Sequence, residues 1–260
     1  MSETSTINYD IERVKEPKVT YPRISGSRNF FIFILGFLGL DILSIIFGNL
    51  SVFFVKQQGV IPLLVYQSSV DYLSMVNGLR YMAAFALLFG LTYPLLPSFK
   101  KAFRQKRTWI RGISYGLLAM IASTAYSIFI NIVYKGGVTD NANQNAVVNV
   151  ILSHPITSFI WIPFLGPIVE ELTYRVGLFD GVRKINKFFA YLVVMLVFGF
   201  IHFDFTTTDL TNELLNLPSY FIAGIIFCYA YDHDGAPSSI VAHVLNNLFS
   251  YAAILITAYL

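Results

Sequence analysis

Ionisable side chains inside otherwise apolar stretches are few in this chain of 260 residues, and they gather in three places. The first place is the segment GPIVEELTYRVGLF, which contains Glu170, Glu171 and Arg175. His202 ends the segment VVMLVFGFIH, and His243 lies in SSIVAHVLNNLFSYAAIL. An ionisable group within a bilayer costs at least about 2.5 kcal/mol, so each of these groups needs a partner or a function.

Each of the three places pairs two residues that lie four apart, and residues four apart share one face of a helix. The three pairs are Glu171 with Arg175, Phe198 with His202, and His243 with Asn247. Glu170 lies about 100° around the helix from Glu171, so the two carboxylates cannot face Arg175 equally. We therefore expect Arg175 to hold Glu171 ionised and in place, and Glu170 to face a cavity as a general base.

Together these groups supply what hydrolysis of a peptide bond needs, namely a base, a held water and donors for the developing oxyanion. Glu170 with His202 would hold and activate the water. His243 and Asn247, on one helix face, would donate to the carbonyl oxygen. At about 1.5 Å per helical residue, the depths of the four groups in the membrane differ by about half the thickness of the hydrocarbon core. A helix tilt or a kink at Pro167 would therefore let them meet.

The composition predicts a membrane protein made of helices. Hydrophobic residues make up 55% of the chain and charged residues 13%, and the mean hydropathy is +0.62. A spanning helix needs about 20 mostly apolar residues, and runs of that kind lie at about residues 30–55, 74–97, 109–134, 147–180, 188–203, 214–231 and 239–259. The predicted fold class is therefore all-α, a polytopic membrane helical bundle of seven or eight transmembrane helices.

The fourth run is too long for one simple crossing and contains Pro155, Pro163 and Pro167. Proline removes a helix hydrogen bond and kinks the helix. This run is therefore either a kinked helix or a short re-entrant piece followed by a span, which leaves an eighth crossing open. The stretch GVIPLLVYQ near Val60 is too short to cross by itself.

Basic residues predict the orientation of the bundle, because lysine and arginine in short loops mark the cytoplasmic side. The loop 98–111 contains Lys100, Lys101, Arg104, Lys106, Arg107 and Arg111. We expect this loop and the N-terminus to be cytoplasmic. The polar leader over residues 1–29 is predicted to be a tail, followed by a single membrane domain over 30–260.

The remaining reactive residues predict little chemistry. Cys228 is the single cysteine, so the chain has no internal disulfide and no cysteine cluster for zinc. We expect structural positions for His154, beside Pro155, and for His233, in the turn sequence YDHDGAP. The net charge of +3 comes without interleaved basic and aromatic residues, so we expect no nucleic acid among the partners.

Three motifs carry a resemblance to a known family. The segments EELTYR at 170–175, FGFIH at 198–202 and HVLNN at 243–247 look like the motifs EExxxR, FxxxH and HxxxN of the type II CAAX prenyl protease and bacteriocin-processing family of membrane peptidases, also called Abi proteins. The resemblance covers about residues 145–250, which would be the catalytic core. It implies that Glu170 and His202 activate water and that His243 and Asn247 form an oxyanion hole. The compact size resembles that of bacterial members, which implies a bacterial cell membrane.

The sequence leaves the role of a metal open. Two histidines and a glutamate can bind zinc with an open position, and members of the family have been labelled metalloproteases, so Glu170, His202 and His243 would be the zinc ligands. However, the chain has no HExxH motif, and asparagine is a poor zinc ligand. We therefore expect a glutamate mechanism without a cofactor.

Three functions remain open on the sequence alone. The leading one is an intramembrane endopeptidase acting on a prenylated tail, a bacteriocin or signalling-peptide precursor, or a membrane-bound regulator. The second is a non-catalytic membrane scaffold or bacteriocin-immunity protein of the same fold. The third is a proton-coupled transporter, which also needs buried carboxylate and histidine groups, but the chain shows no inverted repeat. The oligomeric state does not follow from the sequence.

Overall fold

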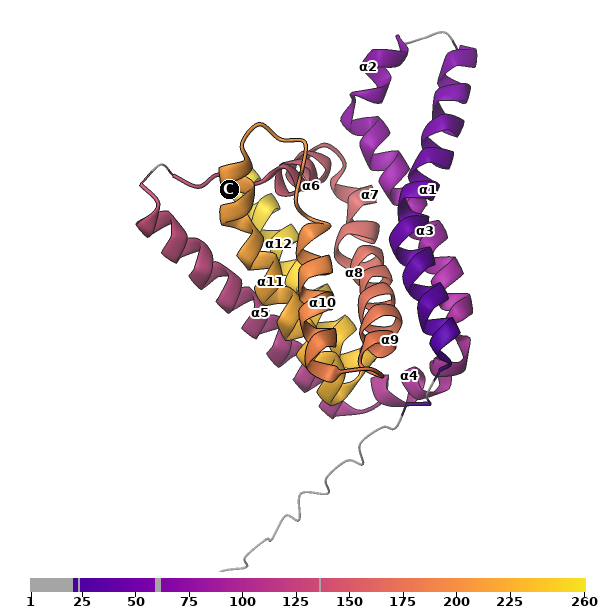
Figure 1. The fold of residues 1–260 in the computed structure, drawn as a ribbon. Helices are drawn as coiled ribbons and strands as arrows, with labels where there is room; N and C mark the ends of the chain where they lie inside the picture. The colour runs from indigo at the N-terminus through magenta and orange to yellow at the C-terminus, as the bar shows by residue number, and fades with distance from the viewer. Residues whose placement is uncertain (1–20, 23, 59–61, 136) are drawn as a thin grey trace, which may run out of the picture.

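The computed structural model describes residues 21–22, 24–58, 62–135 and 137–260 (Figure 1). Most of the leader predicted to be a tail therefore lies outside the described residues. The first helix begins at Gly26.

The described residues form helices and no strand, so the all-α prediction is confirmed. In chain order the elements are α1 (Gly26–Gln58), α2 (Leu63–Gln67), α3 (Val70–Leu91), η1 (Tyr93–Leu95), α4 (Leu96–Phe103), α5 (Lys106–Val133), α6 (Ala142–Ser153), α7 (Pro155–Ile160), η2 (Trp161–Leu165), α8 (Gly166–Glu170), η3 (Glu171–Phe179), α9 (Asp180–Val182), α10 (Lys187–Phe200), α11 (Leu210–Asp234) and α12 (Ala236–Tyr259). The elements η2 and η3 are π-helical, and η1 is a 3₁₀ turn.

Six stretches of the described chain are long and apolar enough to cross a membrane, and they include all the long helices. They are Gly26–Gln57, Val70–Leu91, Lys106–Val133, Pro155–Val182, Leu210–Asp234 and Ala236–Tyr259. The helix α10 is also apolar but has only 14 residues, and α2, with five residues, is too short to cross. Large apolar side chains such as Ile45 and Ile121 are exposed on the outside of the bundle, as lipid-facing side chains are. The chain is therefore an all-α membrane bundle of these helices.

The long fourth apolar run divides at His154, where α6 ends and Pro155 begins a new helix. From Pro155 to Val182 the chain then runs as one continuous helical stretch through two π-helical segments. Pro167 has no backbone N–H to offer, and Gly166 donates its own N–H five residues back, to the carbonyl of Trp161. The run therefore divides into the short helix α6 and one candidate span, Pro155–Val182, which contains two π-helical segments.

The helices run between two ends of the bundle, as Figure 1 shows. The start of α1, the helix α4 and the turn between α9 and α10 lie at one end; α2, α6 and the C-terminus lie at the other. The stretch from α8 to η3 contacts α1 and α3 on one side and α10 and α12 on another, while α5 packs along α11 and α12. The helices that carry the three motifs therefore lie next to one another.

Gly177 allows α1 to approach η3 closely. A Cβ atom at this position would lie 2.7 Å from the backbone nitrogen of Phe33, which is on α1. At Gly39, also on α1, a Cβ atom would meet nothing within 4 Å. The contact between α1 and η3 thus depends on a small residue, as many membrane-helix contacts do.

We expect Gly177→Ala to destabilise the protein by about 1–3 kcal/mol, because the added methyl group presses on backbone atoms that cannot rotate away. Gly39→Ala is the matched control, since it brings the same gain in helix propensity, about 1 kcal/mol, without a clash. Thermal unfolding of the two purified variants in the same detergent measures the difference. Equal unfolding midpoints would contradict the tight contact.

Candidate active site

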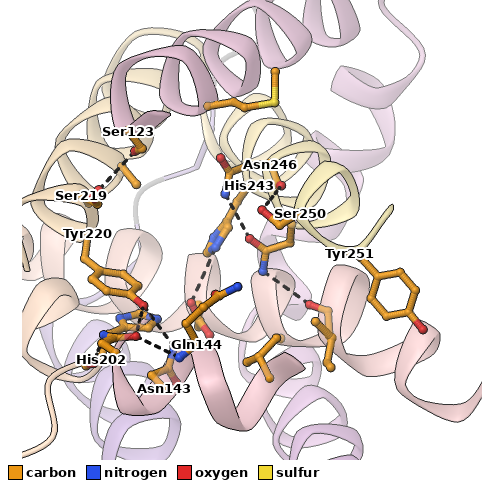
Figure 2. Close-up of a pocket in the computed structure, with 18 of the residues that line it drawn as sticks. Ser123, Asn143, Gln144, His202, Ser219, Tyr220, His243, Asn246, Ser250 and Tyr251 are labelled. Carbon is orange, nitrogen blue, oxygen red and sulfur yellow. Dashed lines mark hydrogen bonds and ion pairs between the residues drawn. The ribbon is translucent and has the colours of Figure 1, made fainter. Parts of the chain in front are cut away.

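All four predicted catalytic side chains line one cavity of about 440 Å³. Glu170 ends α8, His202 follows α10, and His243 and Asn247 lie on α12. Figure 2 shows His202 and His243 at this cavity, on separate segments of the chain. The structure therefore brings together the residues that the sequence places far apart.

Glu170 keeps one side of its carboxylate toward the cavity. Its Oε2 lies 3.7 Å from Nε2 of His243, and its Oε1 accepts a long hydrogen bond of 3.5 Å from the Tyr81 hydroxyl. The side chain is 12% exposed. It forms no ion pair with Arg175 in the described structure, as predicted from the angle between the two glutamates.

Glu171 is fully buried and binds three side chains. Its Oε1 lies 3.0 Å from a guanidinium nitrogen of Arg175 and 2.9 Å from Nδ1 of His243, and its Oε2 accepts from the Ser239 hydroxyl. The predicted pair with Arg175 is present. Glu171 also contacts Ser239 and His243 on α12. Its carboxylate therefore orients the His243 ring, as carboxylates orient the histidines of many metal sites.

His202 has a defined tautomer. Its Nδ1 lies 2.7 Å from the carbonyl oxygen of Phe198, and a carbonyl only accepts, so Nδ1 carries the proton. In the neutral ring Nε2 is then an acceptor. The ring stacks on Tyr220 with centroids 4.4 Å apart, and Asn141 donates to the His202 carbonyl at 3.2 Å, so both the ring and the backbone of this residue are held in place.

His243 is fixed by the carboxylate of Glu171 and by two aromatic rings. Because an ionised carboxylate only accepts, Nδ1 of His243 carries a proton. The ring stacks on Phe227 with centroids 4.5 Å apart and meets the edge of Phe198 at 5.7 Å. Consequently Nε2 can donate to a substrate only when the ring carries both protons.

Asn247 fills a gap in a helix that a proline creates. In a π-helix the carbonyl of Ile162 would accept a hydrogen bond from the backbone N–H of residue 167. That residue is Pro167, which has no N–H. The Asn247 amide instead donates to the Ile162 carbonyl at 3.4 Å, while its oxygen accepts from Asn246 at 3.3 Å. A primary amide has two donor hydrogens, so one remains for a substrate.

Arg175 packs on the ring of Phe198, which lines the cavity. The guanidinium carbon of Arg175 lies 4.6 Å from the centroid of the Phe198 ring, and the guanidinium donates to the Gly224 carbonyl at 3.2 Å. Arg175 is completely buried, so the aromatic face and these oxygens replace the water that it would otherwise bind. Phe198 thus lies between the cavity, which it lines, and the guanidinium of Arg175, and the supporting roles of both residues stay predictions.

Tyr81 and Ser239 were not among the predicted site residues. Tyr81 lies on α3, outside all three motifs, and stacks on Trp161, while Arg80 lies over its ring at 5.2 Å. No sequence pattern links Tyr81 to Glu170. Ser239 had a detectable signal, because it lies four residues before His243 and shares its helix face.

His154 and His233, for which the sequence predicts structural positions, both lie at helix ends. His154 caps the start of α7 and binds Asp71 at 2.8 Å. The segment around His233 is not the expected solvated turn, because it forms the last turn of α11. Its neighbours Asp232 and Asp234 have nearly buried side chains that pair with basic residues, including Lys187 at 2.5 Å and Arg107 at 2.9 Å.

The sequence leaves open a zinc ion held by Glu170, His202 and His243, and all three side chains line the cavity. Within the described part of the chain, no group of three His, Cys, Asp or Glu side chains is arranged to hold a metal ion. Glu170, His202 and His243 share a cavity without forming such a group.

We expect Glu171→Gln to destabilise the protein by about 3–5 kcal/mol, because it leaves the buried charge of Arg175 without its partner. Asp71→Asn is the control, since this carboxylate is 75% exposed and an exposed pair contributes at most about 1 kcal/mol. Thermal unfolding in detergent compares the two. A Glu171→Gln variant as stable as Asp71→Asn would show that Glu171 is not the compensating charge.

Known proteins resemble the part of the chain that forms this site. The family model described as type II CAAX prenyl endopeptidase Rce1-like matches residues 152–249. An uncharacterized protein of Mycoplasma capricolum is 26% identical over 173 residues, which cover 62% of this chain and 49% of that protein. The UPF0177 protein YvdC of Lactococcus lactis is 30% identical over 146 residues, which cover 55% of this chain and 52% of that protein.

YdiL of Bacillus subtilis, which is described as a candidate membrane peptidase, is 30% identical over 112 residues, which cover 42% of each chain. The chain thus spans about half the length of the curated relatives it matches, and no solved structure matches it. The matched residues 152–249 contain the three motifs and every predicted catalytic side chain. Through residues 152–249 the chain is thus similar to the Rce1-like type II CAAX prenyl endopeptidases.

Proposed function

We propose that this protein is an intramembrane endopeptidase that hydrolyses a peptide bond in a membrane-associated peptide or protein. One observation carries the proposal, namely that Glu170, His202, His243 and Asn247 line a single cavity within the helical bundle. The match of residues 152–249 to a family of membrane peptidases supports the same class of reaction.

Glu170 is the general base of the proposed reaction. Its carboxylate takes a proton from a water molecule while the water oxygen attacks the carbonyl carbon of the peptide bond. His202 accepts the other hydrogen of this water with Nε2, because its Nδ1 proton binds the Phe198 carbonyl. Glu170 then passes its proton to the amide nitrogen, the C–N bond breaks, and a carboxylic acid and an amine are released.

His243 and Asn247 stabilise the oxyanion that forms on the carbonyl oxygen. His243 does this as the imidazolium, with Nδ1–H bound to Glu171 and Nε2–H directed at the oxyanion. The carboxylates of Glu170 and Glu171 on either side of the ring attract this positive charge. Asn247 adds the amide hydrogen that the Ile162 carbonyl does not use, so two donors meet the developing charge.

Loss of the general base should abolish the reaction without unfolding the protein. We expect Glu170→Gln and His202→Ala each to lower the cleavage rate by at least about 10²-fold, the usual contribution of general acid–base catalysis. Asp41→Asn is the matched control, because Asp41 is an exposed carboxylate on α1 that does not line the cavity. Peptides in membranes and medium of cells that carry each variant are compared by mass spectrometry.

A peptide that changes with Glu170→Gln and not with Asp41→Asn would identify the substrate. Full activity in Glu170→Gln or His202→Ala would reject the peptidase mechanism. A cellular phenotype that survives Glu170→Gln would instead favour the scaffold or immunity function. Loss of cleavage by the purified protein with a chelator, restored by zinc, would reject the metal-free mechanism.

Tyr81 is a positioning residue in this proposal, since its hydroxyl holds one oxygen of Glu170. Tyr81→Phe should lower kcat about tenfold, equivalent to about 1.4 kcal/mol, and leave KM nearly unchanged. The ring and its stacking on Trp161 remain. Tyr66→Phe, whose hydroxyl contacts Met75 instead, controls for loss of a hydroxyl, and an unchanged kcat in Tyr81→Phe would remove Tyr81 from the site.

A further inference from the structure

The catalytic cavity extends from Glu170 toward one end of the bundle. Its wall at that end consists of polar side chains from the loop before α6, from α6 and from α11, which we call the polar rim. The rim residues are Asp140, Asn141, Asn143, Gln144, Asn216 and Tyr220. Asp140 is exposed, whereas Glu170 is nearly buried, so the cavity reaches the outside of the protein at the rim.

Hydrogen bonds join the polar rim to the first turns of α11. The backbone N–H of Thr139 donates to Asn212 at 3.0 Å, and Asn216 donates to the Thr139 carbonyl at 3.0 Å. The buried Glu213 accepts from the backbone N–H of Ala142 at 2.8 Å. The rim therefore lies at the end of the bundle that contains α6 and the C-terminus (Figure 1).

The main cluster of basic residues lies at the other end, whereas Lys56 lies in the last turn of α1, which ends near α2, and Lys135 follows α5, which ends toward α6 (Figure 1). Lys184 donates to Asn29 near the start of α1 at 2.6 Å, and Arg107 and Lys187 pair with the two aspartates at the end of α11. The helix α4, with Lys100 and Lys101, lies at this same end (Figure 1). By the positive-inside rule this end faces the cytoplasm, which places the rim at the opposite face of the membrane.

The surroundings of the polar rim are acidic. The segments 134–153 and 201–213 contain a single basic residue besides His202, Lys135, whereas Asp140, Asp204 and Asp209 lie in them. The Thr206 hydroxyl and backbone N–H, which both bind the Asp204 carboxylate, lower its pKa, so it stays ionised at neutral pH. A concave site edged by an excess of one sign of charge attracts the opposite charge.

We propose that the site receives a basic, unlipidated peptide segment from the extracytoplasmic face of the membrane. This inference rests on the proposed peptidase function and names its substrate class. The amide side chains of the rim can pair with the N–H and C=O groups of a peptide backbone, and the aspartates attract its lysines or arginines. A lipid-anchored tail of a cytoplasmic protein would approach from the opposite end.

The direction of access is tested without any assay of cleavage. In a Cys228→Ser background, which removes the single, fully buried cysteine, one exposed cysteine is introduced at each end by Asn145→Cys on α6 or by Lys101→Cys on α4. Intact bacterial cells are treated with a membrane-impermeant maleimide. We expect Asn145→Cys to be labelled in intact cells and Lys101→Cys only after permeabilisation; the reverse pattern overturns the inference.

The charge of the substrate is tested with two quenched fluorescent decapeptide libraries that carry two flanking lysines or two flanking glutamates. Intact cells with wild-type protein should cleave the lysine library at least about tenfold faster at low salt, and the difference should shrink as salt screens the rim. The Glu170→Gln variant gives the background. Equal cleavage of both libraries would contradict the preference for a basic substrate. Glu170-dependent cleavage only in inverted vesicles would contradict entry from the extracytoplasmic face. Either result overturns the inference but leaves the proposed peptidase function intact. Cleavage that is the same in Glu170→Gln rejects the peptidase itself, whatever the labelling shows.

Discussion

The buried ion pair between Glu171 and Arg175 is the interaction on which the rest of this structure depends. Both side chains are completely removed from solvent, and separating such a pair inside a bilayer would leave an uncompensated charge. The pair also reaches two other helices, because Arg175 donates to the Gly224 carbonyl on α11 and Glu171 accepts from Ser239 and His243 on α12. One ionic contact therefore fixes three helices and aligns a catalytic ring.

Two adjacent glutamates acquire different chemistry because a helix turns by about 100° per residue. Glu171 is saturated by a guanidinium, a hydroxyl and an imidazole, so it has no capacity left to act on a substrate. Glu170 has only a long contact to Tyr81 and an imidazole 3.7 Å away, and it faces the cavity. Pro167, on the same helical stretch, has no N–H for the Ile162 carbonyl, and this carbonyl instead accepts from Asn247 on α12.

Much of the fold and of the candidate site followed from residue types and spacing. The apolar runs predicted the long helices because a bilayer permits few other structures. The four-residue spacing of Glu171 and Arg175, and of His243 and Asn247, predicted shared faces, since helix geometry is local. The three motifs predicted a membrane peptidase family that the comparisons confirm, although the roles of the individual side chains stay predictions.

Only the tertiary structure decided what the helices bring to one another. Tyr81 lies 89 residues from Glu170 in the chain, and no periodicity encodes a contact of that range. The tautomer of His243 depends on the carboxylate of Glu171, which is 72 residues away in the chain and becomes its partner only when α12 packs beside η3. Likewise, the opening of the cavity away from the basic end arises from how the loop before α6 packs on α11. The sequence by itself thus determined which groups must be buried and paired, because burial of charge is costly at any position in a bilayer. Packing between helices determined which groups meet, because it depends on long-range contacts that local patterns do not contain.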